Sequence, residues 1–198
     1  MTEQGSMLRN VCNTVKTACL VFVFIFCAGS IVHGKEDASI YDMAVMNSDQ
    51  DLLLYFRIKD AFTEEMVKGI ESGIPITFTF YISFFQNRTN LTKTKLVSFD
   101  FDHTLSYDTL KEEYRIQFDE DGERIVTVKS LEEAQKLMAE VNDLQITDLA
   151  SLGTGHKYGV GAKVRLGKKI LPLNFHYIIP FRNFWEFNTE WTEIEFVR

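Results

Sequence analysis

The chain has 198 residues, of which 45% are hydrophobic and 13% aromatic, including 17 Phe. This length and composition argue against a disordered chain and predict one domain with a core of large rings, together with an extension. The chain has 21 basic and 28 acidic residues, and without Arg9, Lys16 and Glu3 of the first 34 residues it has 19 and 27, a net charge of −8. This charge argues against binding of nucleic acid and against electrostatic binding to anionic lipid.

An uncharged run, Ala18–Val32, follows two basic residues, Arg9 and Lys16. Such a run predicts a signal peptide or an N-terminal membrane anchor over residues 1–34, which leaves residues 35–198 as a single β-rich domain. The run is shorter than the roughly 20 residues of a comfortable spanning helix, so cleavage and retention are both open. Basic residues before the run favour a cytoplasmic N-terminal side, so we expect the domain to be carried across the membrane.

The first elements of the domain are predicted to be a hairpin and a helix. Hydrophobic and polar residues alternate over Tyr41–Val45 and again over Leu52–Ile58, which predicts two strands joined by the turn Asn47–Asp51. A helix is then predicted over residues 63–72, with Thr63 as its N-cap and acidic residues in its first turn. Gly73 is the expected end of this helix.

The middle of the chain has the pattern of long strands. Ile76–Phe85 carries large apolar residues at every second position and is the predicted core strand. The polar stretch Gln86–Lys95 separates it from an alternating strand that runs through Leu105. A hairpin of residues 112–118 and 124–128 follows, and Ser130 begins a second helix with a capping box.

After the second helix the pattern returns to strands, at Leu144–Ser151, Tyr158–Leu166, Leu171–Phe181 and Glu190–Val197. Many strands with two short helices predict a mainly β (α+β) fold. We expect an antiparallel β-sandwich-like domain preceded by an N-terminal hydrophobic helix. The chain shows no internal repeat, so an array of small units is not expected.

The stretch FDFDHTL (Phe99–Leu105) has the D-x-D-x-T form of the nucleophile motif in haloacid dehalogenase-like phosphatases. That motif requires aspartates at the carboxyl end of a buried parallel strand. Here apolar and polar residues alternate straight through it, so that Phe101 and His103 fall on one face and Asp100 and Asp102 on the other. We predict a half-buried antiparallel strand whose wet face carries the aspartates. We therefore interpret the protein as a non-enzyme. A haloacid dehalogenase-like phosphatase is kept as a disfavoured alternative, third after the two binding roles described at the end of this section.

Other patterns give weak support for chemistry. The acidic stretch DEDGE (Asp119–Glu123) has the spacing of a calcium loop, but its glycine makes a hairpin turn the simpler interpretation. The stretch Gly153–Lys157 is similar to a phosphate loop, yet it lacks the G-x-x-x-x-G-K-[ST] frame and leads into a strand. A zinc site is unsupported because the histidines of the domain lie far apart in the sequence, at His103, His156 and His176. We predict no catalytic, cofactor-binding or metal-binding residue.

Large rings gather in PFRNFWEFNTEW (Pro180–Trp191), close to the C-terminus. Such a cluster suits a membrane-surface contact, a partner groove or the mouth of a ligand site. The alternative is that these rings form the closing strand and corner of the core. The residues of this candidate interaction surface are Phe181, Phe184, Trp185, Phe187 and Trp191.

Several stretches together resemble the bacterial family called domain of unknown function 4390. They are GIPITFTFYI (Gly73–Ile82), HTLSYDTLKEEYRI (His103–Ile116), SLEEAQKLM (Ser130–Met138), and LPLNF with FRNFWEFNTEW (Leu171–Phe175 and Phe181–Trp191). The resemblance spans most of the domain and keeps order and spacing. Similar members begin with a hydrophobic export or anchor segment, and some are encoded near envelope-signalling sensor kinases, which implies a partner in the envelope. The family implies no activity, cofactor or catalytic residue.

The resemblance and the N-terminal segment together place the expected protein at the bacterial inner membrane, with its domain on the periplasmic side, or free in the periplasm if the signal is cleaved. We expect a non-enzymatic accessory domain that binds an envelope protein through its aromatic C-terminal region or an exposed strand edge, without nucleic acid or cofactor. The alternative is a carrier of lipid or another small hydrophobic ligand, whose Phe-lined interior would hold a cavity of at least roughly 300 Å³.

Overall fold

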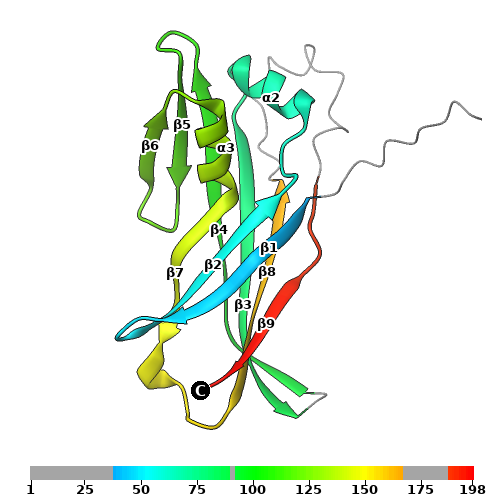
Figure 1. Cartoon of the computed structure of the whole chain (residues 1–198), viewed down its shortest axis with the longest axis vertical. Helices are drawn as coiled ribbons and strands as arrows, with labels where there is room; N and C mark the ends of the chain where they lie inside the picture. The colour runs from blue at the N-terminus through cyan, green and yellow to red at the C-terminus, as the bar shows by residue number, and fades with distance from the viewer. Residues whose placement is uncertain (1–37, 90–91, 167–186) are drawn as a thin grey trace, which may run out of the picture. The chain divides into compact units, whose positions relative to one another are not determined.

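Two antiparallel β-sheets and two short helices make up the described part of the chain (Figure 1). The computed structural model describes residues 38–89, 92–166 and 187–198. One sheet has the strand order β1-β2-β7 and the other the order β6-β5-β4-β3-β8-β9, with antiparallel neighbours throughout. The elements are β1 (Ser39–Asn47), β2 (Asp51–Lys59), α2 (Glu64–Glu71), β3 (Ile76–Thr89), β4 (Thr92–Asp108), β5 (Glu113–Phe118), β6 (Arg124–Val128), α3 (Leu131–Ala139), β7 (Glu140–Asp148), the 3-10 turn η1 (Leu149–Ser151), β8 (Lys157–Leu166) and β9 (Thr192–Val197).

The prediction of a mainly β fold with antiparallel sheets and two short helices is confirmed. The predicted N-terminal hydrophobic helix and the predicted strand Leu171–Phe181 lie outside the described residues. Among the residues that are described, no helix combines the length and the apolar character that crossing a membrane requires.

Both helices begin where the sequence predicts. The side-chain oxygens of Thr63 and Ser130 each accept a hydrogen bond from the amide three residues on, at 3.3 and 3.4 Å. The chain leaves α2 through Gly73, whose φ of +84° is a conformation that glycine adopts without strain. In contrast, α3 passes into β7 at Glu140 without a loop.

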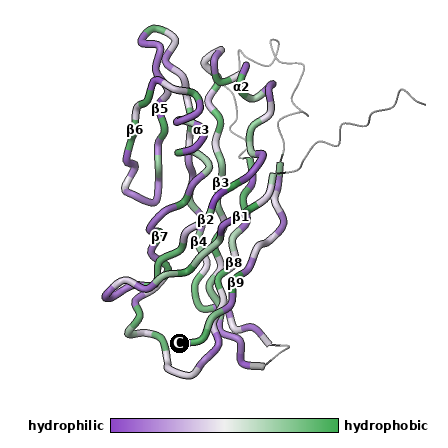
Figure 2. The backbone as a smooth tube through the Cα atoms, viewed as in Figure 1, coloured by the Kyte–Doolittle hydropathy of each residue, from purple (hydrophilic) through white to green (hydrophobic). Residues whose placement is uncertain are grey.

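The two sheets pack against each other through phenylalanine rings. Phe80 of β3 stacks on Phe101 of β4, with 4.9 Å between ring centroids, and it also contacts Phe56 of β2 at 6.0 Å. The second contact joins the six-stranded sheet to the three-stranded one. The buried rings lie on the face of β3 that the sequence predicts, and the same period-two alternation of hydrophobic and hydrophilic residues can be followed along β5 in Figure 2.

The β3–β4 hairpin extends further than the hydrophobic pattern predicts. Its ladder continues into the polar stretch Gln86–Lys95 and pairs Gln86 with Thr94 and Asn87 with Lys93. Backbone hydrogen bonds hold a ladder whatever its side chains are, so polarity on both faces does not end it. The polar end of this hairpin lies beyond the hydrophobic core.

The FDFDHTL stretch lies in β4, which pairs antiparallel with β3 on one side and with β5 on the other. Phe101 and His103 are buried, Asp100 is exposed and Asp102 is half-buried. The prediction of a half-buried antiparallel strand is therefore confirmed. The aspartates lie along the middle of this strand, whereas the phosphatase motif needs the carboxyl end of a parallel one.

Candidate functional site

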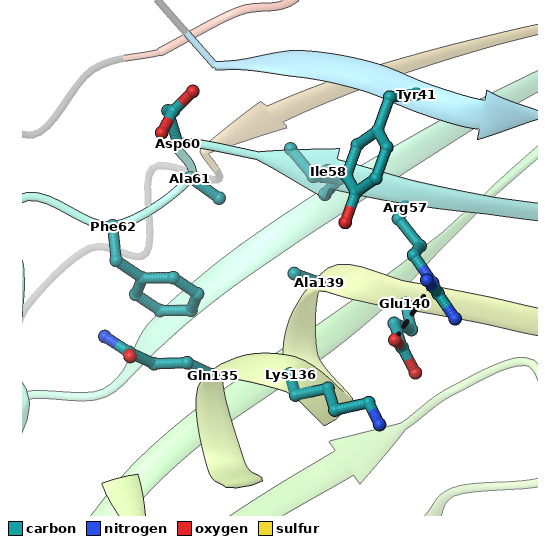
Figure 3. Close-up of a pocket in the computed structure, with 10 residues that line it drawn as sticks. All are labelled: Tyr41, Arg57, Ile58, Asp60, Ala61, Phe62, Gln135, Lys136, Ala139 and Glu140. Carbon is teal, nitrogen blue, oxygen red and sulfur yellow. Dashed lines mark ion pairs between the residues drawn. The ribbon is translucent and has the colours of Figure 1, made fainter. Parts of the chain in front are cut away.

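A pocket of about 360 Å³ lies where the end of β2 meets α3 (Figure 3). We call it the α3 pocket. Its residues come from segments that are far apart in the sequence, which the fold brings to one place. They are Tyr41 of β1, Arg57 and Ile58 of β2, Asp60, Ala61 and Phe62 of the following loop, Gln135, Lys136 and Ala139 of α3, and Glu140 of β7.

The α3 pocket exists because the pairing of β2 with β7 stops short of the end of β2. The last β2–β7 pair joins Arg57 to Glu140, the first residue of β7. Before Glu140 the chain is helical, so the end of β2 beyond Arg57 faces a helix instead of a strand. Asp60, with a φ of +55°, then turns the chain away towards α2. The space left between strand end and helix is the pocket.

The floor of the α3 pocket is apolar. Ile58, Ala61 and Ala139 are 6%, 4% and 9% exposed, and the ring of Phe62 packs against the core ring of Phe78 at 5.2 Å. Figure 3 shows the rings of Tyr41 and Phe62 entering the space from the strand side, opposite the residues of α3. A floor made of core residues is rigid, so the pocket does not depend on the binding of a ligand for its shape.

The rim of the α3 pocket is polar, and two of its side chains have no hydrogen-bond or ion-pair partner among the described residues. Arg57 pairs with Glu140 at 3.1 Å and lies 3.8 Å from Asp42, so its charge is offset. The ammonium group of Lys136 has no hydrogen-bond or ion-pair partner within the described ranges, and neither does the side-chain amide of Gln135. An apolar floor with a free cation at its rim suits a hydrophobic group flanked by an anion.

A second cluster is wholly internal and centres on His103, which is 0% exposed. Its Nε2 atom lies 2.7 Å from Glu120 Oε1, and its Nδ1 atom lies 3.2 Å from the backbone oxygen of Met138. The rings of Phe80 and Phe118 contact the imidazole at 4.4 and 4.7 Å. One side chain of β4 is thereby bound to the last turn of α3 and to the turn between β5 and β6.

The partners of His103 determine how its protons are placed. A carbonyl oxygen only accepts, so Nδ1 carries a hydrogen that it donates to Met138. Glu120 Oε1 lies at hydrogen-bond distance from Nε2 and is the second polar partner of the ring. These two partners offset the cost of burying a polar imidazole among aromatic rings. Both ring nitrogens are engaged, so we assign the cluster a structural role.

Sequence reasoning missed this cluster, although it contained a signal. His103 lies between Phe101 and Leu105 on the predicted buried face, and a histidine there needs polar partners. The partners come from Glu120 and Met138, 17 and 35 residues away, which no spacing rule connects to it.

The predicted C-terminal interaction surface is described in part. Phe181, Phe184 and Trp185 lie outside the described residues. Phe187 packs edge-on against the core ring of Phe78 at 5.0 Å. Trp191 is 46% exposed and lies over Gly161 of β8, on the opposite face of the six-stranded sheet. The two described rings therefore do not share one surface.

The weaker sequence patterns have structural explanations. The stretch DEDGE forms the turn between β5 and β6, with Gly122 at a φ of +68° and Asp121 paired with Arg124 at 2.8 Å. The Gly153–Lys157 stretch leads into strand β8, as predicted. In the described ranges no three His, Cys, Asp or Glu residues gather in a way that could hold a metal ion.

Comparison with known families gives a match over most of the chain. The model of the family described as domain of unknown function (DUF4390) matches residues 35–195. The chain belongs to this family. The matched range begins directly after the predicted N-terminal segment and covers both helices, strands β1 to β8 and the first part of β9, so the α3 pocket and the His103 cluster are parts of the DUF4390 domain. Neither a curated protein nor a solved structure matches the chain.

Proposed function

We propose that this DUF4390 protein is a non-enzymatic accessory protein of the bacterial envelope that binds a partner protein through the α3 pocket. Residues 1–34 would hold it at the inner membrane with the domain on the periplasmic side, or direct its release into the periplasm after cleavage. The uncharged run Ala18–Val32 supports the location. The observation that carries the binding role is the α3 pocket itself, with an apolar floor and an uncommitted cation at its rim.

The chemistry of the α3 pocket defines the partner group. Interfaces concentrate their binding energy in large side chains that fill desolvated pockets. An aromatic side chain buries about 150–250 Å², which at about 25 cal/mol per Å² corresponds to roughly 4–6 kcal/mol before the costs of association. Lys136 would then attract an acidic neighbour of that anchor. The partner segment we expect carries an aromatic or large aliphatic residue beside Asp or Glu.

Site-specific photocrosslinking in living bacteria tests this proposal. A photoreactive amino acid at Gln135 faces the α3 pocket, while the same amino acid at the exposed Glu133 lies about 200° away around the same helix and is the matched control. We expect one discrete adduct from position 135, none from position 133, and a weaker adduct when Lys136→Glu is added. Equal adducts from both positions, or an adduct indifferent to Lys136→Glu, would refute binding at this pocket.

A small hydrophobic ligand is the second candidate, because the α3 pocket exceeds the roughly 300 Å³ of the smallest ligand sites. The interior of the domain favours it less, since the ring of Phe80 contacts both Phe56 and Phe101 there. Native mass spectrometry of the full chain, extracted gently from its membrane fraction, separates the candidates. A bound small molecule favours the carrier and a bound polypeptide the accessory protein. The denatured mass shows whether residues 1–34 remain.

The phosphatase alternative has its own test. Asp100 would be the nucleophile of the D-x-D-x-T motif, and it is exposed on β4. We expect the purified full chain, assayed with p-nitrophenyl phosphate and Mg²⁺, to give the same background rate with and without Asp100→Asn. Phosphatase activity that disappears with this substitution would support the phosphatase alternative.

A further inference from the structure

A second pocket, of about 510 Å³, lies at the polar end of the six-stranded sheet. We call it the hairpin pocket. It forms where the last described residues of β3 and the first of β4 meet the loop before β8 and the end of β9, segments that lie at the lower end of Figure 1. The residues used below are Asn87, Arg88, Lys93, Lys157 and Glu195.

Strand register places the basic residues of the hairpin pocket side by side. Asn87 of β3 pairs with Lys93 of β4 on one side and with Lys157 of β8 on the other. Paired residues in neighbouring strands point to the same face, so two lysines flank one amide in a row across three strands. Arg88 follows Asn87 and also lines the pocket. Three cations thus gather against one lining carboxylate, Glu195, in a chain whose net charge is −7.

Two of these three cations are unpaired within the described part of the chain. Lys93 pairs with Glu193 and lies 4.4 Å over the ring of Phe85. In contrast, the described part of the chain supplies no ion-pair or hydrogen-bond partner to the side chains of Arg88 and Lys157. Uncompensated positive charge in a concave site raises the local concentration of anions. The pocket therefore suits an anion despite the overall negative charge of the protein.

The amide of Asn87 adds a different requirement. Its Nδ2 atom donates to Glu195 Oε1 at 2.7 Å, which turns the Oδ1 atom the other way. That oxygen is buried and accepts no hydrogen bond from any described residue. A buried acceptor without a donor is unfavourable, and a hydroxyl group arriving with the anion would supply the donor.

We infer that the hairpin pocket binds an organic phosphate with a neighbouring hydroxyl group. Arg88 and Lys157 hold the phosphate oxygens, and Asn87 Oδ1 accepts the hydrogen bond of the hydroxyl. A phosphate offers several acceptor oxygens and suits a guanidinium fork together with an ammonium group. The same phosphoglycerol chemistry occurs in a lipid headgroup and in a free glycerol phosphate. This site is separate from the α3 pocket and does not depend on the function proposed there.

Calorimetric titration of the full chain in neutral detergent tests the inference, with glycerol 3-phosphate and methyl phosphate as probes. We expect saturable binding of glycerol 3-phosphate in the millimolar range or tighter, at least threefold tighter than methyl phosphate, and weaker as salt is raised. Arg88→Gln and Lys157→Gln should each weaken it at least fivefold. Lys163→Gln is the matched control, because Lys163 lies on the same strand and face as Lys157 and outside the pocket.

Three results would overturn the inference. One is the absence of heat of binding at 10 mM glycerol 3-phosphate, and another is an effect of Lys163→Gln equal to that of Lys157→Gln. The third is equal affinity for methyl phosphate, which would remove the hydroxyl contact. Unchanged urea unfolding of each variant shows that the fold is intact. Mixed micelles with phosphatidylglycerol, compared with phosphatidylcholine, identify the source: competition with glycerol 3-phosphate indicates a lipid headgroup, and its absence a free phosphate.

Discussion

Replacing His103 with Phe removes the partners of two buried polar groups while keeping a ring of similar size. Among the described residues, His103 is the one hydrogen-bond partner of Glu120 Oε1, and Oε2 is already buried without a partner; the Glu120 side chain as a whole is 15% exposed. Breaking a buried pair costs about 3–5 kcal/mol, and an unpaired carbonyl such as that of Met138 about 1–3 kcal/mol. Glu120 lies on a turn and can rotate towards water, so we expect His103→Phe to lower the free energy of unfolding by about 2–4 kcal/mol.

Urea unfolding of the full chain at pH 7 measures this loss, and a double-mutant cycle assigns it. Glu120→Gln keeps a hydrogen-bonding group opposite Nε2, so we expect it to cost only about 0.5–1.5 kcal/mol. Adding Glu120→Leu to His103→Phe removes the carboxylate that His103→Phe leaves unpaired, so the double variant should be more stable than His103→Phe alone. A cost of His103→Phe below about 0.5 kcal/mol, or a double variant no more stable than the single one, would refute the structural role.

Three further predictions concern stability. Gly159→Ala should cost about 1–3 kcal/mol, because the new Cβ would lie 2.5 Å from the ring of Phe85. Gly161→Ala should cost less, because the nearest contact of its new Cβ is at 3.3 Å. Thermal unfolding of both variants checks which of them is the less stable. Thr63→Ala should cost about 0.5–2 kcal/mol through the lost cap of α2, and an unchanged urea midpoint would contradict that. Burial raises the pKa of Tyr114, so its contribution to stability is complete below the ordinary tyrosine pKa of about 10 and is lost as pH rises further. In Tyr114→Phe the free energy of unfolding should therefore fall less steeply with pH above about pH 10 than in the unsubstituted protein. Equal pH slopes for the two proteins would refute this.

The local elements of this protein follow from short-range pattern. Thr63 and Ser130 cap the two helices as predicted, and the alternation through FDFDHTL places Asp100 on the exposed face of β4. Both outcomes depend on residues within a few positions of one another, through a hydrogen bond to the third amide along or through the two-residue period of a strand. Such signals are complete in the sequence.

The candidate site was not predictable in the same way. Arg57 and Glu140 are far apart in the chain, and their pairing as the last rung between β2 and β7 creates the α3 pocket. The row of Lys93, Asn87 and Lys157 likewise depends on the order of β4, β3 and β8 in their sheet. Neither strand order nor register is encoded by a local period.

The sequence by itself determined the class of the domain, the helix caps, the inner and outer faces of the strands and the membership of a family whose stretches it carries. Only the tertiary structure decided that β7 pairs with β2 and that His103 of β4 contacts a glutamate in the turn between β5 and β6. It also decided that two pockets form where strand pairing or hydrophobic packing ends. The physical reason is that alternation and capping are local interactions. Pockets and buried polar pairs arise from contacts between distant segments, whose partners are chosen by the packing of the whole domain.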